Sequence, residues 1–367
     1  MNIEAVTTPQ QQQQFLDVPW RVYKDDPNWV PPLRSSIAKQ LAPDNPFFEY
    51  GELQQFIATE NGEAVGRIVA AINRRLNESE GKIVGIFGYF ECIDDFEVAR
   101  SLLKAAEDWL RDRGAVVLRG PIDLYTHNNC LFLVEGFDSP PYMMMPYNPP
   151  YYPEFLERDG WYKAKDAYAY DFSMNPLENK YEKAHRIACK SGITFRPVRI
   201  KGEGFDRDCL DIYRIFTETF SHSWSASPRT EAEFIAEAKD LKQVVDPDIF
   251  PIAEYDGEMV GFCMTLPDYN IAFKHIDGKL DLWGILKLLW YRRQIDRART
   301  IAICCLPEYR RKMVSAALVY ELMEGGKKRG YKRAELSWVW QDNLLSRRIT
   351  EAAGGVAYKT YRMYEKV

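Results

Sequence analysis

Residues 298–318, ARTIAICCLPEYRRKMVSAAL, place three consecutive cations between an apolar run and a helical pattern. The apolar run at 300–305 predicts a buried strand, and the cations Arg310, Arg311 and Lys312 follow it in a short turn. The first N–H groups of a helix are unpaired, and its dipole places partial positive charge at the same end. The pattern therefore predicts an anion site where the turn enters the helix.

Three other side chains are candidates for proton transfer: Glu91 in YFEC, His127 in LYTHNNC and Glu335 in AELSW. A carboxylate in an apolar strand has its pKa raised by desolvation, which suits a general base near neutral pH. Each candidate has a structural alternative: Glu91 could pair with an arginine, His127 could be a loop histidine and Glu335 could belong to an edge-strand ion pair. Cys130 could be a nucleophile, although a buried cysteine is the commoner case.

The composition narrows the class of protein. The chain has 367 residues, 46% of them hydrophobic and 28% charged, which is typical of a globular protein of more than one domain. Its net charge of -5 argues against a general nucleic-acid binder. The seven cysteines are scattered and the four histidines lie far apart, so we expect reduced thiols and no metal site. The N-terminal residues do not resemble a signal peptide, which predicts a cytoplasmic protein.

The predicted elements occur twice in the same order: helices, a hairpin, a strand, a helix, a strand, a helix and a final strand. The interval from Asn148 to Gly160 equals that from Asn343 to Gly355, and each holds a short helix and a glycine stop before a Tyr-rich strand. We interpret this as an internal duplication. The fold class is then α/β (α+β), with two similar domains, each a mixed, mostly antiparallel twisted sheet flanked by helices. The predicted divisions are residues 1–172, a linker and bridging helix at 173–192, and residues 193–367.

This layout resembles the GNAT acyltransferase superfamily, as a tandem of two such domains. In that family the central strand leads into a pyrophosphate-binding turn of the form (Gln/Arg)-x-x-Gly-x-(Gly/Ala). In PEYRRKMVSAAL, Arg310 takes the first position, whereas Met313 and Ser315 stand where the glycines belong. The corresponding N-terminal stretch, YFECIDDFEVAR, has no glycine turn and carries acidic residues that would repel a phosphate. The resemblance therefore places any coenzyme site in the C-terminal half.

Longer phrases, among them DPNWVPPL, FGYFECIDD, LVEGFDSPP, MMPYNPPYYPE and ELSWVWQDN, resemble the bacterial ceramide-synthase-like group of tandem GNAT proteins. This resemblance implies direct transfer of an acyl group from acyl-CoA, or another acyl thioester such as an acyl carrier protein, to a small-molecule amine. The amine acceptors that this resemblance implies include lipid-like molecules such as a long-chain amino alcohol. It implies no permanently bound cofactor, with acyl-CoA as cosubstrate. The implied coenzyme-binding residues are Leu306, Arg310, Arg311, Lys312, Ser315, Asn343 and Ser346.

The family's general-acid tyrosine has no counterpart at its usual place. By the spacing from Asn343, that place falls near Thr350, and Tyr361 or Tyr364 could substitute for it. Asn343 could also simply cap the last helix. The run Met143–Met145 could line an acyl pocket, or could pack in an ordinary core.

An insertion, KLDLWGILKLLWYRRQIDRAR, forms an apolar helical stripe followed by arginines. A basic amphipathic helix with tryptophans can lie on an anionic membrane or cover a lipid tail. In the first case, the segment Leu282–Arg293 predicts peripheral membrane contact at the inner face. The alternative is a core-facing helix with a solvated basic end. The sequence gives no oligomeric state.

Two other function classes stay open at this point. The lost glycines and the missing tyrosine are also compatible with a non-catalytic protein that binds acyl ligands or serves as a scaffold. Tandem GNAT folds also serve aminoacyl-tRNA-dependent transfer, although the acidic net charge argues against a nucleic-acid partner.

Overall fold

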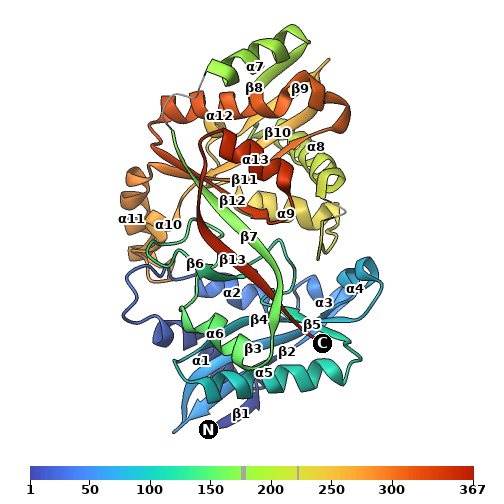
Figure 1. Ribbon diagram of the computed structural model, residues 1–367. Coiled ribbons are helices and arrows are strands. Elements are labelled where there is room, and N and C mark those ends of the chain that lie inside the picture. Colours follow the sequence, from blue (N-terminus) through green and yellow to red (C-terminus); the bar gives the residue numbers. More distant parts are fainter. Residues whose placement is uncertain (175–178, 221–222) are drawn as a thin grey trace.

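The computed structural model describes residues 1–174, 179–220 and 223–367. Its strands form one mixed, twisted sheet of 13 strands that runs through both halves of the molecule (Figure 1). The strands are β1 (Asn2–Ala5), β2 (Gly51–Glu60), β3 (Glu63–Asn73), β4 (Val84–Cys92), β5 (Val117–Gly120), β6 (Phe132–Glu135), β7 (Tyr162–Ser173), β8 (Ile193–Pro197), β9 (Pro251–Tyr255), β10 (Glu258–Pro267), β11 (Arg297–Cys305), β12 (Arg333–Trp340) and β13 (Val356–Lys366).

The N-terminal half is an antiparallel meander, β1 to β4, followed by a parallel pairing of β4 with β5. Asn61 and Gly62 both have positive φ, the conformation that a tight hairpin between β2 and β3 needs. The amphipathic helix α5 packs its apolar side against β3 and the neighbouring strands. The helices of this half are α1 (Pro9–Val22), α2 (Arg34–Gln40), α3 (Phe47–Tyr50), α4 (Arg74–Glu80), α5 (Phe96–Arg111) and α6 (Tyr151–Arg158).

The C-terminal half repeats this plan. Strands β8 to β11 are antiparallel, a hairpin at Asp256-Gly257 joins β9 to β10, and β11 pairs with β12 in parallel. Its helices are α7 (Asn179–Lys190), α8 (Gly202–Phe220), α9 (Glu231–Leu241), α10 (Asn270–Phe273), α11 (Leu282–Tyr291), α12 (Val314–Arg329) and α13 (Leu344–Ala352). Three short 3₁₀ turns are η1 (Pro247–Ile249), η2 (Arg292–Gln294) and η3 (Pro307–Lys312).

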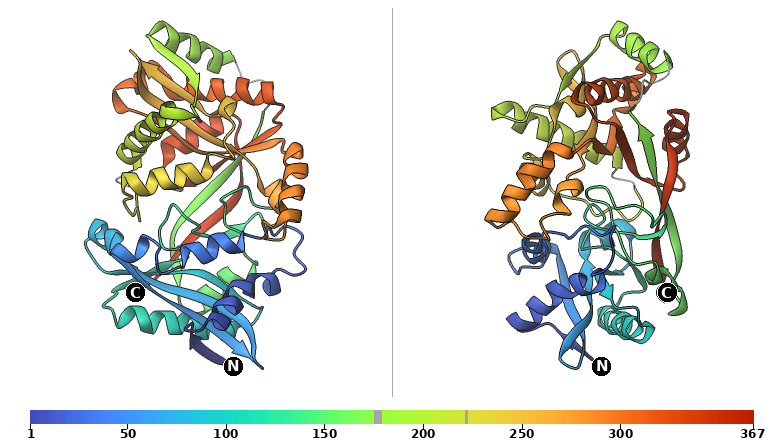
Figure 2. Two further views of the ribbon diagram at one scale, coloured as in Figure 1. Left: turned by 180° about the vertical axis from the view of Figure 1, so that it is seen from behind. Right: turned by 90° about the vertical axis from the view of Figure 1, so that its left-hand side faces the viewer.

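The final strands of the two halves are exchanged. Strand β7, which ends the N-terminal half, pairs with β12 of the C-terminal half, and the C-terminal strand β13 pairs with β5 and β6 of the N-terminal half. The two long strands also pair with each other and cross the middle of the molecule together (Figures 1 and 2). Each half therefore completes the other's sheet, and the junction is a packed sheet rather than a linker.

The predicted fold class is confirmed, and the repeated order of elements is present. Helix α6 is the short helix expected between Asn148 and Gly160, and α12 ends at Arg329, before Gly330, whose positive φ stops it. The sequence did not predict the short strands β1, β6 and β8 or the exchange of β7 and β13. The divisions at residues 172 and 192 stay a prediction, and part of the predicted linker, 175–178, lies outside the described residues.

Candidate functional site

A cavity of about 1490 Å³ lies between the two halves. Small-molecule sites usually measure about 300–1,000 Å³, so this one is large enough for two substrates or for a long one. Its N-terminal wall comes from residues 29–40, strand β4 and the irregular segment 121–148. Its C-terminal wall comes from α8, α9, β11, β12 and the first turns of α12 and α13.

The cation turn after β11 forms one end of this cavity. Met313 has φ +63° and joins η3 to α12, so it adopts the left-handed conformation that glycine adopts most readily. Among the residues that the structure describes, no side chain caps the N-terminus of α12. Arg310 and Ser315 both line the cavity. The turn thus leaves an open helix N-terminus beside a cation, which is an arrangement suited to an anion, although the glycines of the motif are replaced.

The other predicted residues of this turn face elsewhere. The Lys312 ammonium donates to the carbonyl of Ser191 at 3.3 Å and lies 3.7 Å over the ring of Tyr255, away from the cavity. Leu306 extends the pairing of β11 by donating its N–H to Val260 and packs in the core. Arg311 is exposed to solvent and does not line the cavity. Of the three cations, Arg310 alone reaches the cavity.

The first turn of α13 forms a second part of the same wall. Asn343 caps this helix by accepting the N–H of Ser346 at 3.2 Å, and both residues line the cavity. Thr350, at the place of the family's tyrosine, is buried and also lines it. Tyr361 and Tyr364 are buried in the sheet and do not line the cavity. Neither tyrosine is therefore positioned to act there.

Strands β11 and β12 diverge beside these two helix ends. Their parallel pairing runs from Arg297 and Arg333 to Thr300 and Leu336. Beyond it, residues of both strands line the cavity, including Ile303 and the run 337–340. Backbone N–H groups on diverging strands can donate to a substrate carbonyl and to the negative charge that develops on its oxygen during acyl transfer.

Glu91, on β4, lines the opposite wall. Its carboxylate accepts a hydrogen bond from the Tyr152 hydroxyl at 2.8 Å, and Arg67 lies 3.9 Å away. The side chain is 15% exposed. Desolvation raises the pKa of Glu91 to about 7, although Arg67 and the hydroxyls of Tyr152 and Tyr23 oppose this rise. A carboxylate with this pKa, open to a cavity, can accept a proton near neutral pH.

Asp123, which the sequence analysis did not single out, is a second carboxylate on this wall. It accepts the backbone N–H of Tyr89 at 2.6 Å and the Asn129 amide at 3.2 Å, and burial raises its pKa to about 6. Gly88 allows this approach, because a Cβ there would lie 2.3 Å from the carbonyl oxygen of Ile122. The only sequence signal was an isolated aspartate between apolar residues in PIDLY.

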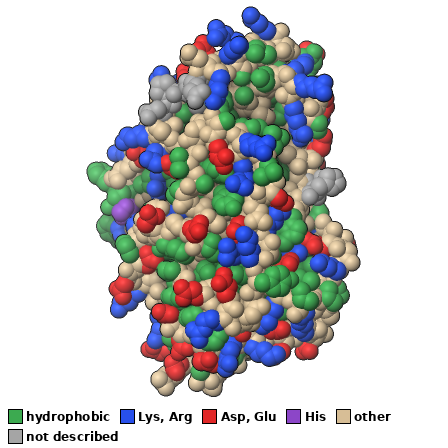
Figure 3. Space-filling model, viewed as in Figure 1, with side chains coloured by type: hydrophobic (Ala, Val, Ile, Leu, Met, Phe, Trp, Pro, Cys, Tyr) green, Lys and Arg blue, Asp and Glu red, His purple; other side chains and the backbone are tan. Residues whose placement is uncertain are grey.

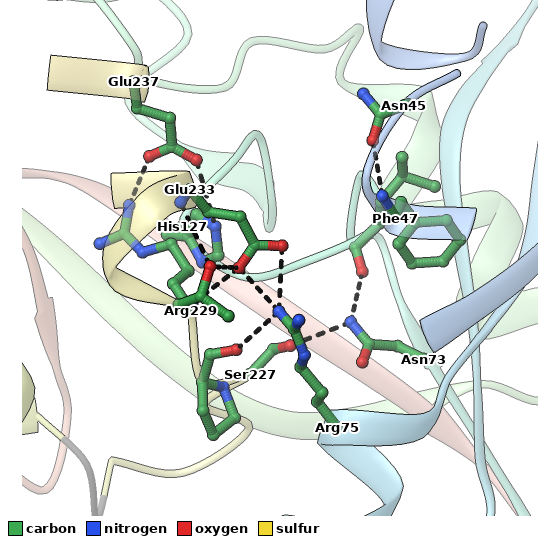
Figure 4. A network of polar contacts seen from close by, with 12 residues as sticks. Asn45, Phe47, Asn73, Arg75, His127, Ser227, Arg229, Glu233 and Glu237 are labelled. Carbon is green, nitrogen blue, oxygen red and sulfur yellow. Dashed lines mark hydrogen bonds and ion pairs between the residues drawn. The ribbon is translucent and has the colours of Figure 1, made fainter. Parts of the chain in front are cut away.

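His127 lines the cavity beside helix α9. Its ring stacks on Tyr125 at 4.0 Å, and its Nε2 lies 3.6 Å from the Glu237 carboxylate, which also binds Arg229 (Figure 4). Burial and the charge of Arg229 hold the pKa of His127 well below its usual value, so the ring is neutral at pH 7. A second pair in Figure 4, Arg75 and Glu233 at 2.7 Å, fastens α9 to the N-terminal half.

Glu335 does not reach the cavity. It is fully buried on β12, where it accepts hydrogen bonds from the hydroxyls of Ser337 and Tyr358 and lies 3.9 Å from Arg299. Arg299 in turn donates to the backbone carbonyls of Met143 and Met144, each at 3.1 Å. Glu335 therefore orients an arginine that joins the central strand to the 121–148 segment. Cys130 is also buried and does not line the cavity. Its thiol contacts the backbone carbonyl of Thr126.

Comparison with known proteins agrees with this arrangement. The model of the acetyltransferase (GNAT) family matches residues 209–354, which span the cation turn and both cavity-lining helix ends of the C-terminal half. A bacterial ceramide synthase of Caulobacter vibrioides (strain NA1000 / CB15N) is 34% identical over 375 residues, covering 100% of this chain and 97% of that protein. The chain therefore belongs to the GNAT acyltransferase family, and the protein is a transferase.

Other similar proteins include protein YghO of Escherichia coli (strain K12), 32% identical over 368 residues, which cover 96% of this chain and 92% of that protein. Two solved structures share the tandem fold at low identity. A tandem GNAT protein from the clavulanic acid biosynthesis pathway has a TM-score of 0.60 at 12% identity, covering 100% of this chain and 98% of its own. A GNAT protein from Sphaerobacter thermophilus has a TM-score of 0.54 at 15% identity, and the match covers 99% of this chain and 95% of that protein.

Proposed function

We propose that this protein is an N-acyltransferase that moves a long acyl group from acyl-CoA to the amine of a lipid-like acceptor, such as a long-chain amino alcohol. The observation that carries the proposal is a single cavity with an anion-binding helix end in one wall and proton-accepting carboxylates in the other. Such a cavity can hold a thioester and an amine together.

The residues present fit a coenzyme pyrophosphate. The N-terminus of α12 presents first-turn N–H groups, and the left-handed Met313 keeps the backbone bend that lets a phosphate approach. Arg310 adds a full charge, and Ser315 adds a hydroxyl. From there the acyl-bearing arm would run between β11 and β12, where the two strands diverge.

Transfer needs a free amine, an open path to the carbonyl carbon and a proton acceptor. In the proposed reaction the amine nitrogen forms a bond to the thioester carbonyl carbon, and the carbon–sulfur bond breaks. Glu91 accepts the proton that the nitrogen releases, directly or through one water, and passes it to solvent, from which the leaving thiolate takes up a proton. Backbone N–H groups of the diverging strands stabilise the oxygen anion of the intermediate.

An apolar wall supports a long hydrocarbon chain as part of the substrate. Helix α8, the segment after α9 and strand β10 line the cavity with partly buried apolar side chains: Tyr213, Phe216 and Phe220 on α8, Val245 after α9, and Met264 on β10. Aromatic and methionine side chains pack well against hydrocarbon. The C. vibrioides relative, named a bacterial ceramide synthase, further supports a lipid-like acceptor.

The test is to incubate the purified protein with acyl-CoAs of increasing chain length and a panel of amines, including long-chain amino alcohols. Free thiol should be released only when an amine is present, and mass spectrometry should find the amide. Binding of CoA is measured separately by calorimetry. CoA binding without amine-dependent thiol release would instead favour a non-catalytic acyl-ligand-binding protein, for which the absence of a tyrosine at Thr350 is the supporting feature. No CoA binding would contradict both.

A further inference from the structure

Helix α11 turns its apolar side chains to solvent. Only Gly284 of its ten residues is buried, and the core-facing alternative for this helix is therefore wrong. Trp283 is 72% exposed and Trp290 64%. The other large apolar side chains that the helix exposes are Leu282, Ile285, Leu286 and Leu289. Figure 3 shows hydrophobic side chains gathered at the left edge of the molecule, where Figure 1 places α11.

Local contacts fix both ends of the helix. The Asp281 carboxylate caps its start by accepting the N–H of Gly284 at 2.8 Å, and a Cβ at Gly284 would lie 2.1 Å from the Lys279 carbonyl oxygen. At its other end, the Tyr291 ring stacks on His275 at 3.6 Å. The apolar ridge is therefore held outward by fixed contacts at both ends.

The segment around α11 has a positive net charge, whereas the net charge of the whole chain is negative. Residues 279–293 carry four cations and one acid, whereas the chain has a net charge of -5. Lys287, Arg292 and Arg293 are exposed next to the apolar ridge. Apolar side chains with tryptophans, flanked by lysine and arginine, are the features of a helix that lies in the interface of an anionic bilayer.

We infer that α11 is a membrane-docking helix that inserts its apolar ridge into the surface of a bilayer containing anionic lipid. In the described part of the chain, no helix is both long and apolar enough to cross a membrane, so α11 would lie in the bilayer surface. A symmetric contact between two copies through this helix would bring like cations together, which disfavours a second copy as the occupant.

The segment that leads into α11 contacts the part of the chain that forms one wall of the cavity. Just before the helix, Asp277 accepts a hydrogen bond from the Trp20 indole at 2.6 Å, and the Gly278 carbonyl accepts the N–H of Arg34 at 3.1 Å. The adjacent Pro32 and Leu33 line the cavity. Docking through α11 would hold this wall near the bilayer, from which a lipid-like acceptor could enter. This last step rests on the proposed function, whereas docking itself does not.

The experiment is flotation of the full-length protein with vesicles of phosphatidylcholine alone or of an equal mixture with phosphatidylglycerol. We expect the wild type to float with the mixed vesicles and to bind at least tenfold more weakly to phosphatidylcholine. The Trp283→Ser/Trp290→Ser variant should remain unbound. The Arg292→Gln/Arg293→Gln variant should lose binding on the order of tenfold or more, since each cation near such a surface contributes to binding.

The matched controls are Val116→Ser, which removes an exposed apolar side chain elsewhere, and Lys327→Gln/Lys201→Gln, which removes two exposed cations elsewhere. Both should float like the wild type, and circular dichroism should show that every variant is folded. Equal flotation of wild type and the tryptophan variant would overturn the proposal. So would a wild type that stays unbound, or one that forms dimers which the tryptophan variant abolishes. Vesicle binding needs no acyl transfer, so a protein that docks but transfers nothing would contradict only the proposed function.

Discussion

The two halves of the molecule contain the same strand-turn-helix unit with opposite chemistry at the helix start. After β11, helix α12 begins at Val314, directly after Met313, no described side chain caps it, and Arg310 lies beside its start in the cavity wall. After β4, helix α5 begins at Asp95, whose carboxylate accepts the N–H of Glu97 at 2.8 Å. A helix start that is already occupied by a carboxylate is closed to a phosphate, whereas the other remains open.

The comparison also explains where the proton acceptors lie. The N-terminal half, without an anion site, places Glu91 and Asp123 in the cavity, and burial raises the pKa of both. In the C-terminal half, the strand carboxylate Glu335 is buried beside Arg299 and does not reach the cavity. Glu237 lines the cavity but is paired with Arg229. In the proposed function, one half therefore provides anion binding and the other proton transfer, and the exchanged strands β7 and β13 hold the two walls in one sheet.

The largest expected effect comes from removing the N-terminal carboxylate. Glu91→Gln keeps the side-chain shape but cannot accept a proton, so kcat should fall about 10²- to 10⁴-fold while CoA affinity stays within about twofold. Steady-state kinetics and calorimetry measure the two quantities. Glu97→Gln, an exposed glutamate on α5, is the control and should retain activity. Unchanged kcat in Glu91→Gln, with lost activity in Asp123→Asn, would assign the base to Asp123 instead.

The pH dependence should identify the same group. A base must be ionised, so kcat/KM calculated from the concentration of unprotonated amine should be constant above the pKa of Glu91, about 7, and should fall about tenfold for each pH unit below it. If Asp123 were the base, the fall would begin near its pKa of about 6. A pH profile of the wild type, measured where circular dichroism shows the fold intact, distinguishes the two midpoints. The residual activity of Glu91→Gln should lose the step near pH 7.

Substitutions in the C-terminal wall of the cavity should weaken the binding of CoA. Arg310→Ala removes the one cation of the turn that reaches the cavity, and CoA affinity should weaken about tenfold or more, since a charge-assisted hydrogen bond contributes about 1.5–3 kcal/mol. Calorimetry with CoA measures this loss. Arg311→Ala is the control, because Arg311 is exposed outside the cavity, and its CoA affinity should be unchanged. Equal losses in both variants would mean that the turn acts only through its net charge.

The sequence predicted much of the fold, because most elements have strong local signals. The hairpin turns at Asn61-Gly62 and Asp256-Gly257 and the glycine stop of α12 depend on backbone conformations that few residues adopt. The exchange of β7 and β13 had no such signal. Either final strand offers the same alternating pattern to its own half or to the other, so only tertiary pairing decides.

Part of the candidate site was also predictable, because some of its residues lie on elements with strong local signals. Residues on regular elements, such as Glu91 in β4 and Ser315 in α12, lie in the cavity as their positions suggested. The direction of a side chain in a turn is not set by spacing, and Lys312 points away from the cavity toward Ser191. Asp123 was missed because its surroundings come from β4, which is distant in the sequence.

The smallest expected effect comes from a substitution at Met313, in the turn between η3 and α12. Met313 holds φ +63°, a conformation that costs a residue with a Cβ about 1–2 kcal/mol and glycine almost nothing. Met313→Gly should therefore raise the free energy of unfolding by up to about 1 kcal/mol, after the entropy cost of glycine, and should tighten CoA binding a few-fold because the backbone can approach the phosphate more closely. Chemical denaturation and calorimetry measure these changes. Met313→Ala, which shortens the side chain but keeps the Cβ, should gain no stability. An equal gain in both variants would show that the bulk of Met313, and not the backbone conformation, limits this turn.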